Sequence, residues 1–265
     1  MALQTVIFQD LGNMSYKDAW DYQEQMLQQN LRAKAVAAEQ WHTQQASLER
    51  ALVQQAAVGG ADPSVAGFSF GEVAVETTHY FLIVEHPPVY TLGKSGKEEH
   101  VLIDEEERVR KGIEYFRTNR GGDITFHGPG QLVGYPILDL EKFYTDIGKY
   151  LRSLEEVIIL TLDEYGVKGE SSAGETGVWI EPDVKGRERK ICAMGVRCSR
   201  WITMHGFAFN VNTDLSYFDH IVPCGIRGKQ VTSLKKELGR EVSMEDVKEK
   251  VKLNFEKVFG VELKS

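Results

Sequence analysis

The chain has 265 residues, of which 42% are hydrophobic and 26% are charged, and this composition is typical of a globular protein that buries a sizeable core. Its formal net charge of −8 disfavours non-specific binding to nucleic acid as the main activity. Three cysteines without a Cys-x-x-Cys pair indicate neither a disulfide framework nor a structural zinc site, so we expect no bound metal.

The N-terminal part is predicted to contain a strand over 5–12 and then a helix over 15–40 with Ser15 as its N-cap. From about 41 to 72 the sequence is rich in Gln and Ala, and then in Gly, Pro and Ser. This change predicts a helix extension that is followed by a surface loop. The sequence shows no signal peptide and no apolar run of the ~20 residues that span a bilayer. We therefore expect a cytoplasmic enzyme that does not enter membranes.

Strand-type segments and two further helices follow in mixed order. The strands are predicted over 79–93 with an interruption at Pro87-Pro88, and over 113–119, 131–140, 176–181, 189–201 and 202–213. The helices are predicted over 146–167 and 243–259, where Ser243 and Asp246 have capping-box spacing. Because most strands are joined by short links, the pattern favours an α+β fold, a single domain whose mixed, largely antiparallel sheet is flanked by helices.

The segment "RGGDITFHGPGQ" (120–131) combines a glycine pair, an arginine and a histidine. It matches neither the P-loop pattern nor the dinucleotide-binding pattern, because Gly121-Gly122 is followed by strand-forming residues and Asp123 would repel a phosphate. One interpretation is a β-hairpin whose glycines take positive φ angles. The other is a ligand site, where backbone without side chains lets a ligand approach closely while His127 and the Gly-Pro-Gly turn form one wall.

Cys224 is the best candidate for a nucleophile. It lies between Pro223 and Gly225 in a loop-forming segment, where a thiol is accessible, although most free cysteines are small buried hydrophobes. Cys192 and Cys198 lie within a predicted strand and are expected to be packing residues. A reactive thiolate also needs a nearby positive charge or a base.

Lys190 and two histidines are candidate partners for Cys224. Lys190 begins a mostly apolar strand. It is therefore either a solvated charge beside the "GRER" loop or a side chain in the cleft that lowers the pKa of a thiol or transfers a proton. His127 and His205 lie nearest to these segments, and a Cys–His pair is the alternative to a Cys–Lys pair. The residues alone leave this choice open.

Five segments occur together in this chain: "EHPPVYTLG" (85–93), "RGGDITFHGPGQLVGYP" (120–136), "RKICAMGVR" (189–197), "HGFAFNVNTDLSYFDHIVPCG" (205–225) and "VTSL" (231–234). In their order and spacing the sequence resembles the lipoyl(octanoyl) transferases over roughly residues 5–25 and 79–260. It departs from them in an extended insert at about 40–75, which adds surface, and in Phe126, where the family often has Tyr or Trp. The resemblance implies the fold of the biotin/lipoate protein ligase catalytic domain.

The resemblance also implies an activity, the transfer of an octanoyl group from octanoyl-acyl carrier protein to a lysine of lipoyl domains, which is the first step of endogenous protein lipoylation. The acceptors would be lipoyl domains of 2-oxoacid dehydrogenase E2 subunits and the glycine cleavage H protein. No cofactor would be required, because phosphopantetheine is carried by the acyl carrier protein.

The same resemblance assigns roles to residues. Cys224 matches the nucleophile that becomes the acyl thioester, and Lys190 matches the lysine that lowers the pKa of this cysteine. The residues that match the acyl-substrate-binding segments are Arg120, Gly121, Gly122, Asp123, Ile124, Thr125, Phe126, His127, Ala193, Met194, Gly195, Gly206, Phe207 and Ala208.

Two alternatives are an ATP-dependent lipoate or biotin ligase with the same fold and a non-enzymatic acyl-binding protein. A ligase needs an adenylate pocket, and the Gly-Arg-Gly-Arg segment typical of biotin ligases is absent from the sequence, whereas Lys190 and Cys224 together argue against a binding protein. Because carrier proteins are usually acidic, we expect docking at a local basic surface, formed by the "KGRERK" run (185–190) with Arg117 and Arg120.

Overall fold

The computed structural model describes residues 3–57, 76–222 and 230–265. Within these ranges the main sheet has nine strands, in the order β12-β1-β2-β6-β10-β9-β8-β7 with β11 beside β9. These strands are β1 Gln4–Asn13, β2 His79–Glu85, β6 Gln131–Ile137, β7 Glu170–Ser172, β8 Glu175–Ile180, β9 Arg189–Ser199, β10 Ile202–Asn210, β11 Gln230–Val231 and β12 Val261–Lys264. A second sheet has the order β4-β3-β5, with β3 Val89–Leu92, β4 Glu114–Arg117 and β5 Ile124–His127.

Most strand pairs in the main sheet are antiparallel. This holds for β2 with β6, β6 with β10, β10 with β9, β9 with β8 and β8 with β7. The parallel pairs are β1 with β2, β1 with β12 and β11 with β9. The prediction of a mixed, largely antiparallel sheet in an α+β fold is therefore confirmed.

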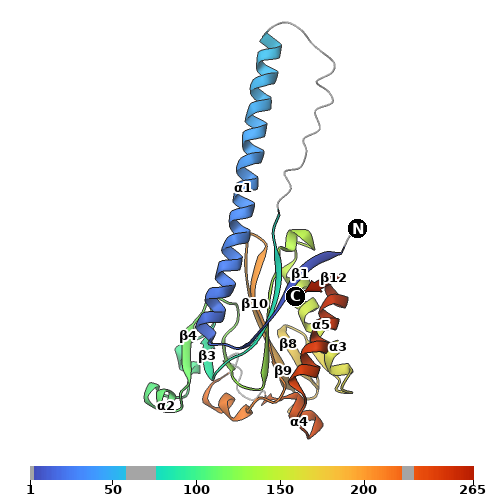
Figure 1. Ribbon diagram of the computed structural model, residues 1–265. Helices are drawn as coiled ribbons and strands as arrows, with labels where there is room; N and C mark the ends of the chain where they lie inside the picture. The colour runs from blue at the N-terminus through green and yellow to red at the C-terminus, as the bar shows by residue number, and fades with distance from the viewer. Residues whose placement is uncertain (1–2, 58–75, 223–229) are drawn as a thin grey trace.

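Helices cover both faces of the main sheet (Figure 1). The helices α3 Ile147–Asp163 and α5 Met244–Phe259 pack on one face, and the first half of α1 Tyr16–Ala57 packs on the other. The side chains of β2 alternate between these two layers, because successive residues of a strand point to opposite faces. Phe81 belongs to the core under α3 and α5, whereas Leu82 belongs to the core under α1. This burial on both faces explains why the segment is almost continuously apolar.

The predicted helix starts are confirmed by their caps. The Ser15 hydroxyl accepts a hydrogen bond from the backbone N–H of Asp18 at the start of α1. The Ser243 hydroxyl accepts one from the backbone N–H of Asp246 at the start of α5, which satisfies one of the free donors of a helix N-terminus. Two short helices, α2 Glu105–Arg110 and α4 Leu234–Leu238, were not predicted, since they are shorter than the window over which helical periodicity is visible.

The helix α1 is a single element of 42 residues, and its second half projects from the body of the molecule (Figure 1). Its sequence contains neither Gly nor Pro and is rich in Ala, Gln, Glu and Leu, all of which favour helix. The predicted extension beyond residue 40 is confirmed up to residue 57. The remainder of the predicted loop, from 58 to 72, lies outside the described residues.

A buried ion-pair network attaches α1 to the sheet where the helix leaves the body. The ammonium of Lys34 lies 2.6 Å from a carboxylate oxygen of Asp139 and 2.9 Å from one of Glu141, and it donates a hydrogen bond to the carbonyl of Arg200. The second oxygen of Asp139 accepts a hydrogen bond from the hydroxyl of Thr77. The Asp139 side chain is only 1% exposed, so these protein partners, rather than water, stabilise its negative charge.

Lys34→Met is expected to lower the free energy of unfolding by about 3 kcal/mol, because it leaves the Asp139 carboxylate buried without its cation. Urea unfolding at pH 7 measures this change. The matched control is Lys17→Met, which removes an ion pair with Asp21 whose two side chains are both 55% exposed and which contributes little. Equal stability losses in the two variants would contradict the anchoring role of Lys34.

Candidate active site

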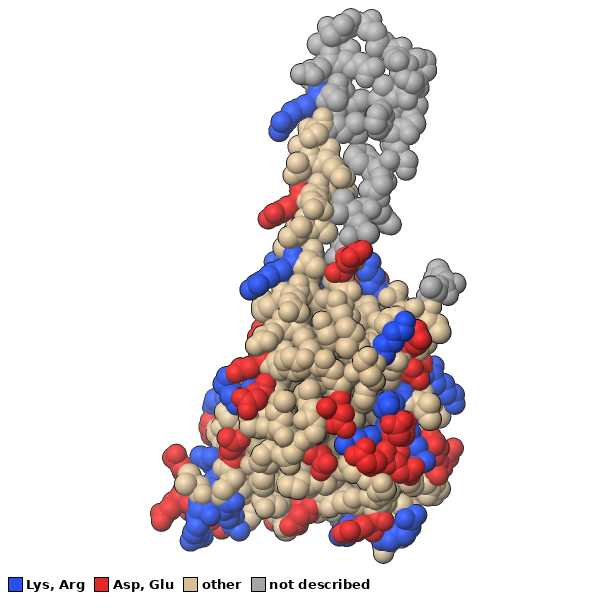
Figure 2. Space-filling view, in the orientation of Figure 1, with Lys and Arg blue, Asp and Glu red and all other residues tan. Residues whose placement is uncertain are grey.

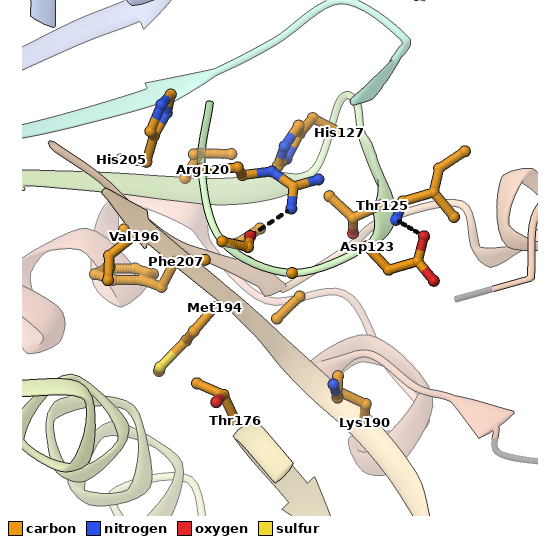
Figure 3. A pocket seen from close by; sticks show the side chains of 18 of the residues that line it. Arg120, Asp123, Thr125, His127, Thr176, Lys190, Met194, Val196, His205 and Phe207 are labelled. Carbon is orange, nitrogen blue, oxygen red and sulfur yellow. Dashed lines mark hydrogen bonds between the residues drawn. The ribbon is translucent and has the colours of Figure 1, made fainter. Parts of the chain in front are cut away.

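A cavity of about 510 Å³ runs along the paired strands β9 and β10 (Figure 3). Lys190 lies at the start of β9, and Val196, six residues further along, pairs with His205 of β10. At ~3.3 Å per residue these two ends are roughly 20 Å apart. Figure 3 shows Lys190 and Thr176 at one end of the cavity, and Arg120 and His205 at the other.

Most residues that the sequence predicted for acyl binding do line this cavity. They are Arg120, Gly121, Gly122, Asp123, Ile124, Thr125, His127, Ala193, Met194, Gly195, Gly206, Phe207 and Ala208, and Lys190 lines it as well. The segments that carry them are far apart in the chain. Residues 193–195 and 206–208 meet because β9 and β10 form a hairpin through Arg200 and Trp201, whose φ angles of 48° and 66° are those of a tight two-residue turn. The segment that begins at Arg120 joins them through a hydrogen bond from Gly121 to Val196.

Phe126 is the exception. It is a neighbour of His127 in β5, and successive strand residues point to opposite sides. Its ring stacks on Tyr217, with the centroids 4.5 Å apart and the planes 7° apart, and it also contacts Phe218 edge-on at 5.6 Å. The structure therefore places Phe126 in the small core behind the cavity wall, and the predicted contact of this side chain with the acyl chain does not fit its position.

The Arg-Gly-Gly loop packs directly on the backbone of β9. The backbone N–H of Gly121 donates a hydrogen bond of 2.9 Å to the carbonyl of Val196. A side chain at Gly195 would place its Cβ 2.6 Å from the carbonyl oxygen of Gly121, so a glycine is required there. Gly122 has a φ angle of 87°, which favours glycine for a second reason. The predicted β-hairpin is not formed, because β4 and β5 each pair with β3 and not with each other, and Gly122 but not Gly121 has a positive φ angle. The backbone that approaches the glycines closely is that of β9.

Arg120 is only 7% exposed, and its buried side chain stabilises the Arg-Gly-Gly loop. Its guanidinium donates to the carbonyl of Gly121 and to both the carbonyl and the hydroxyl of Thr91. The prediction that Arg120 belongs to a basic docking surface is therefore wrong. In the "KGRERK" run, Arg189 pairs with the carboxylates of Glu181 and Glu237, so part of that predicted basic surface is neutralised. Figure 2 shows basic and acidic side chains intermixed over the visible face of the body.

Two histidines in the cavity wall are held neutral by burial. Removal from water lowers the pKa of His205 to about 3, and the nearby charge of Arg120 acts in the same direction. Burial also lowers the pKa of His127 well below its ordinary value. His205 has a φ angle of 61°, a strained conformation for a non-glycine residue, and its ring nitrogen Nε2 lies 2.8 Å from the amide oxygen of Asn119. A thiolate–imidazolium pair needs a charged ring, so these environments disfavour a Cys–His arrangement.

Lys190 occupies the other end of the cavity, beside the strand that follows the Cys224 segment. Its ammonium lies 4.5 Å from the centroid of the Trp179 ring. Cys224 itself lies outside the described residues, and the chain is described again from Gln230. There β11 pairs in parallel with β9, with Gln230 opposite Arg189 and Val231 opposite Lys190. The chain therefore runs next to Lys190 at Val231, seven residues after Cys224.

The two cysteines that the structure describes are poor nucleophiles. Cys192 is fully buried, and burial raises the pKa of its thiol far above the ordinary range. Cys198 is partly buried, and desolvation raises its thiol pKa as well. Both environments suit packing residues rather than thiolates, as their place in a predicted strand indicated.

Several cavity residues carried no recognisable signal in the sequence. Tyr16 lines the cavity from α1, with its hydroxyl buried and without a hydrogen-bond partner among the described residues, but its spacing only indicated a helical apolar stripe. Thr176 and Tyr135 enter from β8 and β6. Each comes from an element whose own pattern indicates only packing, so the sequence could not assign them to the site.

Metal-binding side chains do not gather in the part of the chain that the structure describes. It holds no group of three or more His, Cys, Asp or Glu side chains that could bind a metal ion. Among these described residues, no helix combines the length and the apolar character needed to cross a membrane.

The comparisons with known proteins agree with this architecture. The model of the family described as "Lipoyl protein ligase A/B catalytic domain" matches residues 44–256. The octanoyltransferase of Christiangramia forsetii is 51% identical over 256 residues, which cover 96% of this chain and 96% of that protein. The octanoyltransferase of Flavobacterium psychrophilum is 51% identical over 257 residues, with 97% of each chain covered.

Two solved structures share the fold at much lower identity. A bi-partite lipoate protein ligase from Thermoplasma acidophilum superposes with a TM-score of 0.58 at 19% identity, over 76% of both chains. A lipoate-protein ligase A bound with ATP superposes with a TM-score of 0.58 at 16% identity, over 71% of this chain and 75% of that one. At such identities the likeness shows the fold alone.

The chain therefore belongs to the lipoyl protein ligase A/B catalytic domain family, as the resemblance in the sequence predicted. Its identity to octanoyltransferases over nearly the whole length further makes it an acyltransferase with octanoyltransferase activity.

The free energy of unfolding is expected to fall as the pH drops from 6.5 towards 3. The pKa of His205 is about 3 in the folded protein, against an ordinary value of 6.5. Below pH 6.5 His205 is protonated in the unfolded chain but stays neutral in the folded protein. The unfolded state is therefore favoured as the pH falls, and the free energy of unfolding that is present above pH 6.5 is lost. His205→Asn should reduce the slope by about 1 kcal/mol per pH unit between pH 6 and 5, as measured by urea unfolding.

The control for this experiment is His42→Asn, which changes an exposed histidine on α1 and should leave the slope unaltered. A His205→Asn protein with the same pH dependence as the wild type would show that His205 titrates normally in the folded state.

Proposed function

We propose that the enzyme transfers an octanoyl group from octanoyl-acyl carrier protein to a lysine of lipoyl domains, through an acyl thioester on Cys224. One observation carries this proposal. The strand that follows the Cys224 segment pairs with β9 at Lys190, at one end of a largely apolar cavity. A thiol and an ammonium group would thus meet where an acyl chain can lie with its carbonyl towards Lys190.

In the first step, the Cys224 sulfur attacks the acyl carbonyl carbon, and the bond from this carbon to the carrier's sulfur breaks. The Lys190 ammonium stabilises the attacking Cys224 thiolate and then gives a proton to the departing phosphopantetheine thiolate, which leaves Lys190 neutral. One thioester replaces another of similar free energy, so no ATP and no diffusible cofactor are needed.

In the second step, the amine of the acceptor lysine attacks the thioester carbonyl, and the bond between this carbon and the Cys224 sulfur breaks. The amine loses a proton to Lys190, which is neutral after the first step, and Cys224 leaves as a thiolate, so that the ammonium–thiolate pair is restored. An amide is more stable than a thioester, so the second step drives the overall reaction. The alternation of the two substrates is the ping-pong order of covalent catalysis.

The cavity suits an eight-carbon acyl chain. Met194 and Phe207 face each other across β9 and β10 as a cross-strand pair, and both line the cavity. The adjacent pair of Gly195 and Gly206 adds no side-chain volume. Burial of a CH₂ group contributes about 0.8 kcal/mol, so the whole chain gains several kcal/mol of binding free energy.

The acceptors that we propose are the lipoyl domains of 2-oxoacid dehydrogenase E2 subunits and the glycine cleavage H protein. Support comes from the family to which the chain belongs, whose name refers to lipoyl protein modification. The fold neighbour from Thermoplasma acidophilum was likewise studied with its E2 lipoyl domain.

Exposure of the protein to octanoyl-acyl carrier protein is expected to add one octanoyl group, detectable by intact-protein mass. Cys224→Ser should abolish the thioester adduct, whereas Cys192→Ser, which changes a buried thiol, should retain it. Lys190→Ala should slow adduct formation by about 100-fold or more, the size of a lost general acid–base group. An adduct that persists as a thioester in Cys224→Ser would refute the proposed intermediate.

An ATP-dependent ligase is the second candidate, because a fold neighbour is a ligase bound with ATP. The two activities separate when octanoate with ATP is compared with octanoyl-acyl carrier protein as the donor. We expect product from the carrier thioester alone. Product that forms only from octanoate with ATP would replace the transferase proposal by the ligase.

A further inference from the structure

The Trp179 side chain lies under the ammonium of Lys190 but outside the cavity. The Lys190 nitrogen is 4.5 Å from the centroid of the Trp179 ring, a cation–π distance. Trp179 is 3% exposed, so its ring is held by the protein around it. Lys190 lines the cavity and Trp179 does not, so the contact with Lys190 is a route by which this ring can affect the reaction.

The register between β8 and β9 places these two residues opposite each other. Val178 pairs with Cys192, but its neighbour Trp179 pairs with Lys190, so that β9 holds one extra residue, Ile191, at this point. Such a bulge redirects side chains relative to a regular ladder, and bulges are frequent beside active sites. Because of this bulge, Lys190 lies directly opposite the buried Trp179.

Gly177 provides the space through which the Lys190 stem passes. It has a φ angle of 115°, and a Cβ at this position would lie 2.5 Å from the carbonyl oxygen of Cys192 and 3.5 Å from Cε of Lys190. Gly177 and Trp179 are two residues apart in β8 and so share one face of the strand. The lysine stem thus passes over Gly177, and its ammonium lies over the ring of Trp179.

The carboxylate of Glu155, on α3, holds β8 in place at Gly177. Glu155 is fully buried on α3. One of its oxygens accepts a hydrogen bond of 2.9 Å from the backbone N–H of Gly177, and the other accepts one of 2.6 Å from the hydroxyl of Ser171. Arg152 balances its charge at 2.7 Å. The strand that carries Trp179 is therefore attached to a helix of the core rather than to the surface.

We propose that Trp179 is a positioning residue for Lys190, holding the ammonium over its ring at the point where the proposed reaction needs a proton relay. This inference rests on the proposed role of Lys190 and adds the group on which Lys190 depends. A lysine has a flexible four-carbon stem, so an unsupported ammonium would occupy many positions around the reacting carbonyl. The Trp179 ring and the space beside Gly177 limit these positions before the substrate binds. Proton transfer is efficient when the groups that exchange the proton are held in place in this way.

The experiment measures octanoyl transfer by Trp179→Leu and Trp179→Phe in the full-length enzyme. Leucine keeps an apolar side chain but removes the aromatic face, and kcat is expected to fall about 10-fold, in line with the loss of one cation–π contact. KM for the octanoyl donor should stay within about 2-fold, because Trp179 does not line the cavity. Phenylalanine restores a ring, and kcat should return to within about 3-fold of the wild type.

A double-mutant cycle separates positioning from a general structural effect. In the Lys190→Ala background, Trp179→Leu should cause no further loss, since the group on which it acts is gone. Phe259→Leu, which perturbs the hydrophobic core at the C-terminal end of α5 and does not line the cavity, is the control for a general loss of stability. It should lower the melting temperature while leaving kcat near the wild-type value.

The outcomes distinguish this inference from the proposed function. If Lys190→Ala transfers octanoyl groups at the wild-type rate, the proposed role of Lys190 fails. If Lys190→Ala is slow but Trp179→Leu multiplies the loss by the same factor in both backgrounds, only the positioning role of Trp179 is overturned. That role is likewise overturned if Trp179→Phe is as slow as Trp179→Leu.

Discussion

The antiparallel pairing of β9 with β10 is the interaction on which the rest of the site depends. It brings Gly195 opposite Gly206 in the wall of the cavity. A Cβ at Gly206 would lie 2.2 Å from the carbonyl oxygen of Gly134 on β6, and one at Gly195 would lie 2.6 Å from that of Gly121. Two glycines therefore allow the neighbouring backbones to close in on this hairpin from both sides, with the Arg-Gly-Gly loop on one strand and β6 on the other. A side chain at either position would push these walls apart.

The two ends of the cavity differ in their electrostatics. At the end near His205, burial keeps the imidazole neutral and lowers its pKa to about 3, while the buried guanidinium of Arg120 stabilises the loop. At the other end, the ammonium of Lys190 lies over an aromatic ring and beside the chain that follows Cys224. A positive charge next to a thiol favours the thiolate, which is why we propose that the reaction takes place at this end and that the acyl chain extends from it. Lipoate protein ligases share this fold, so the architecture alone does not decide the reaction.

Much of the fold could be predicted because the local patterns are strong. The apolar run of β2, buried on both faces, and the capping box at Ser243 both correspond to elements in the structure. For the site, the glycines around Arg120 and the apolar strand that begins at Lys190 indicated residues that do line one cavity. These predictions succeeded because strand alternation, helix capping and the need for glycine at close contacts are all decided by residues near in sequence.

The sequence by itself determined the family and the types of most strands and helices, and it indicated candidate residues for acyl transfer. Only the tertiary structure decided which way these side chains face. It turned Phe126 away from the cavity onto Tyr217, buried Arg120, and placed Trp179 under Lys190 through a bulge between two strands. These outcomes depend on strand register and on contacts between segments far apart in the chain. A shift of one residue in register changes the face on which a side chain lies without any change in the local pattern.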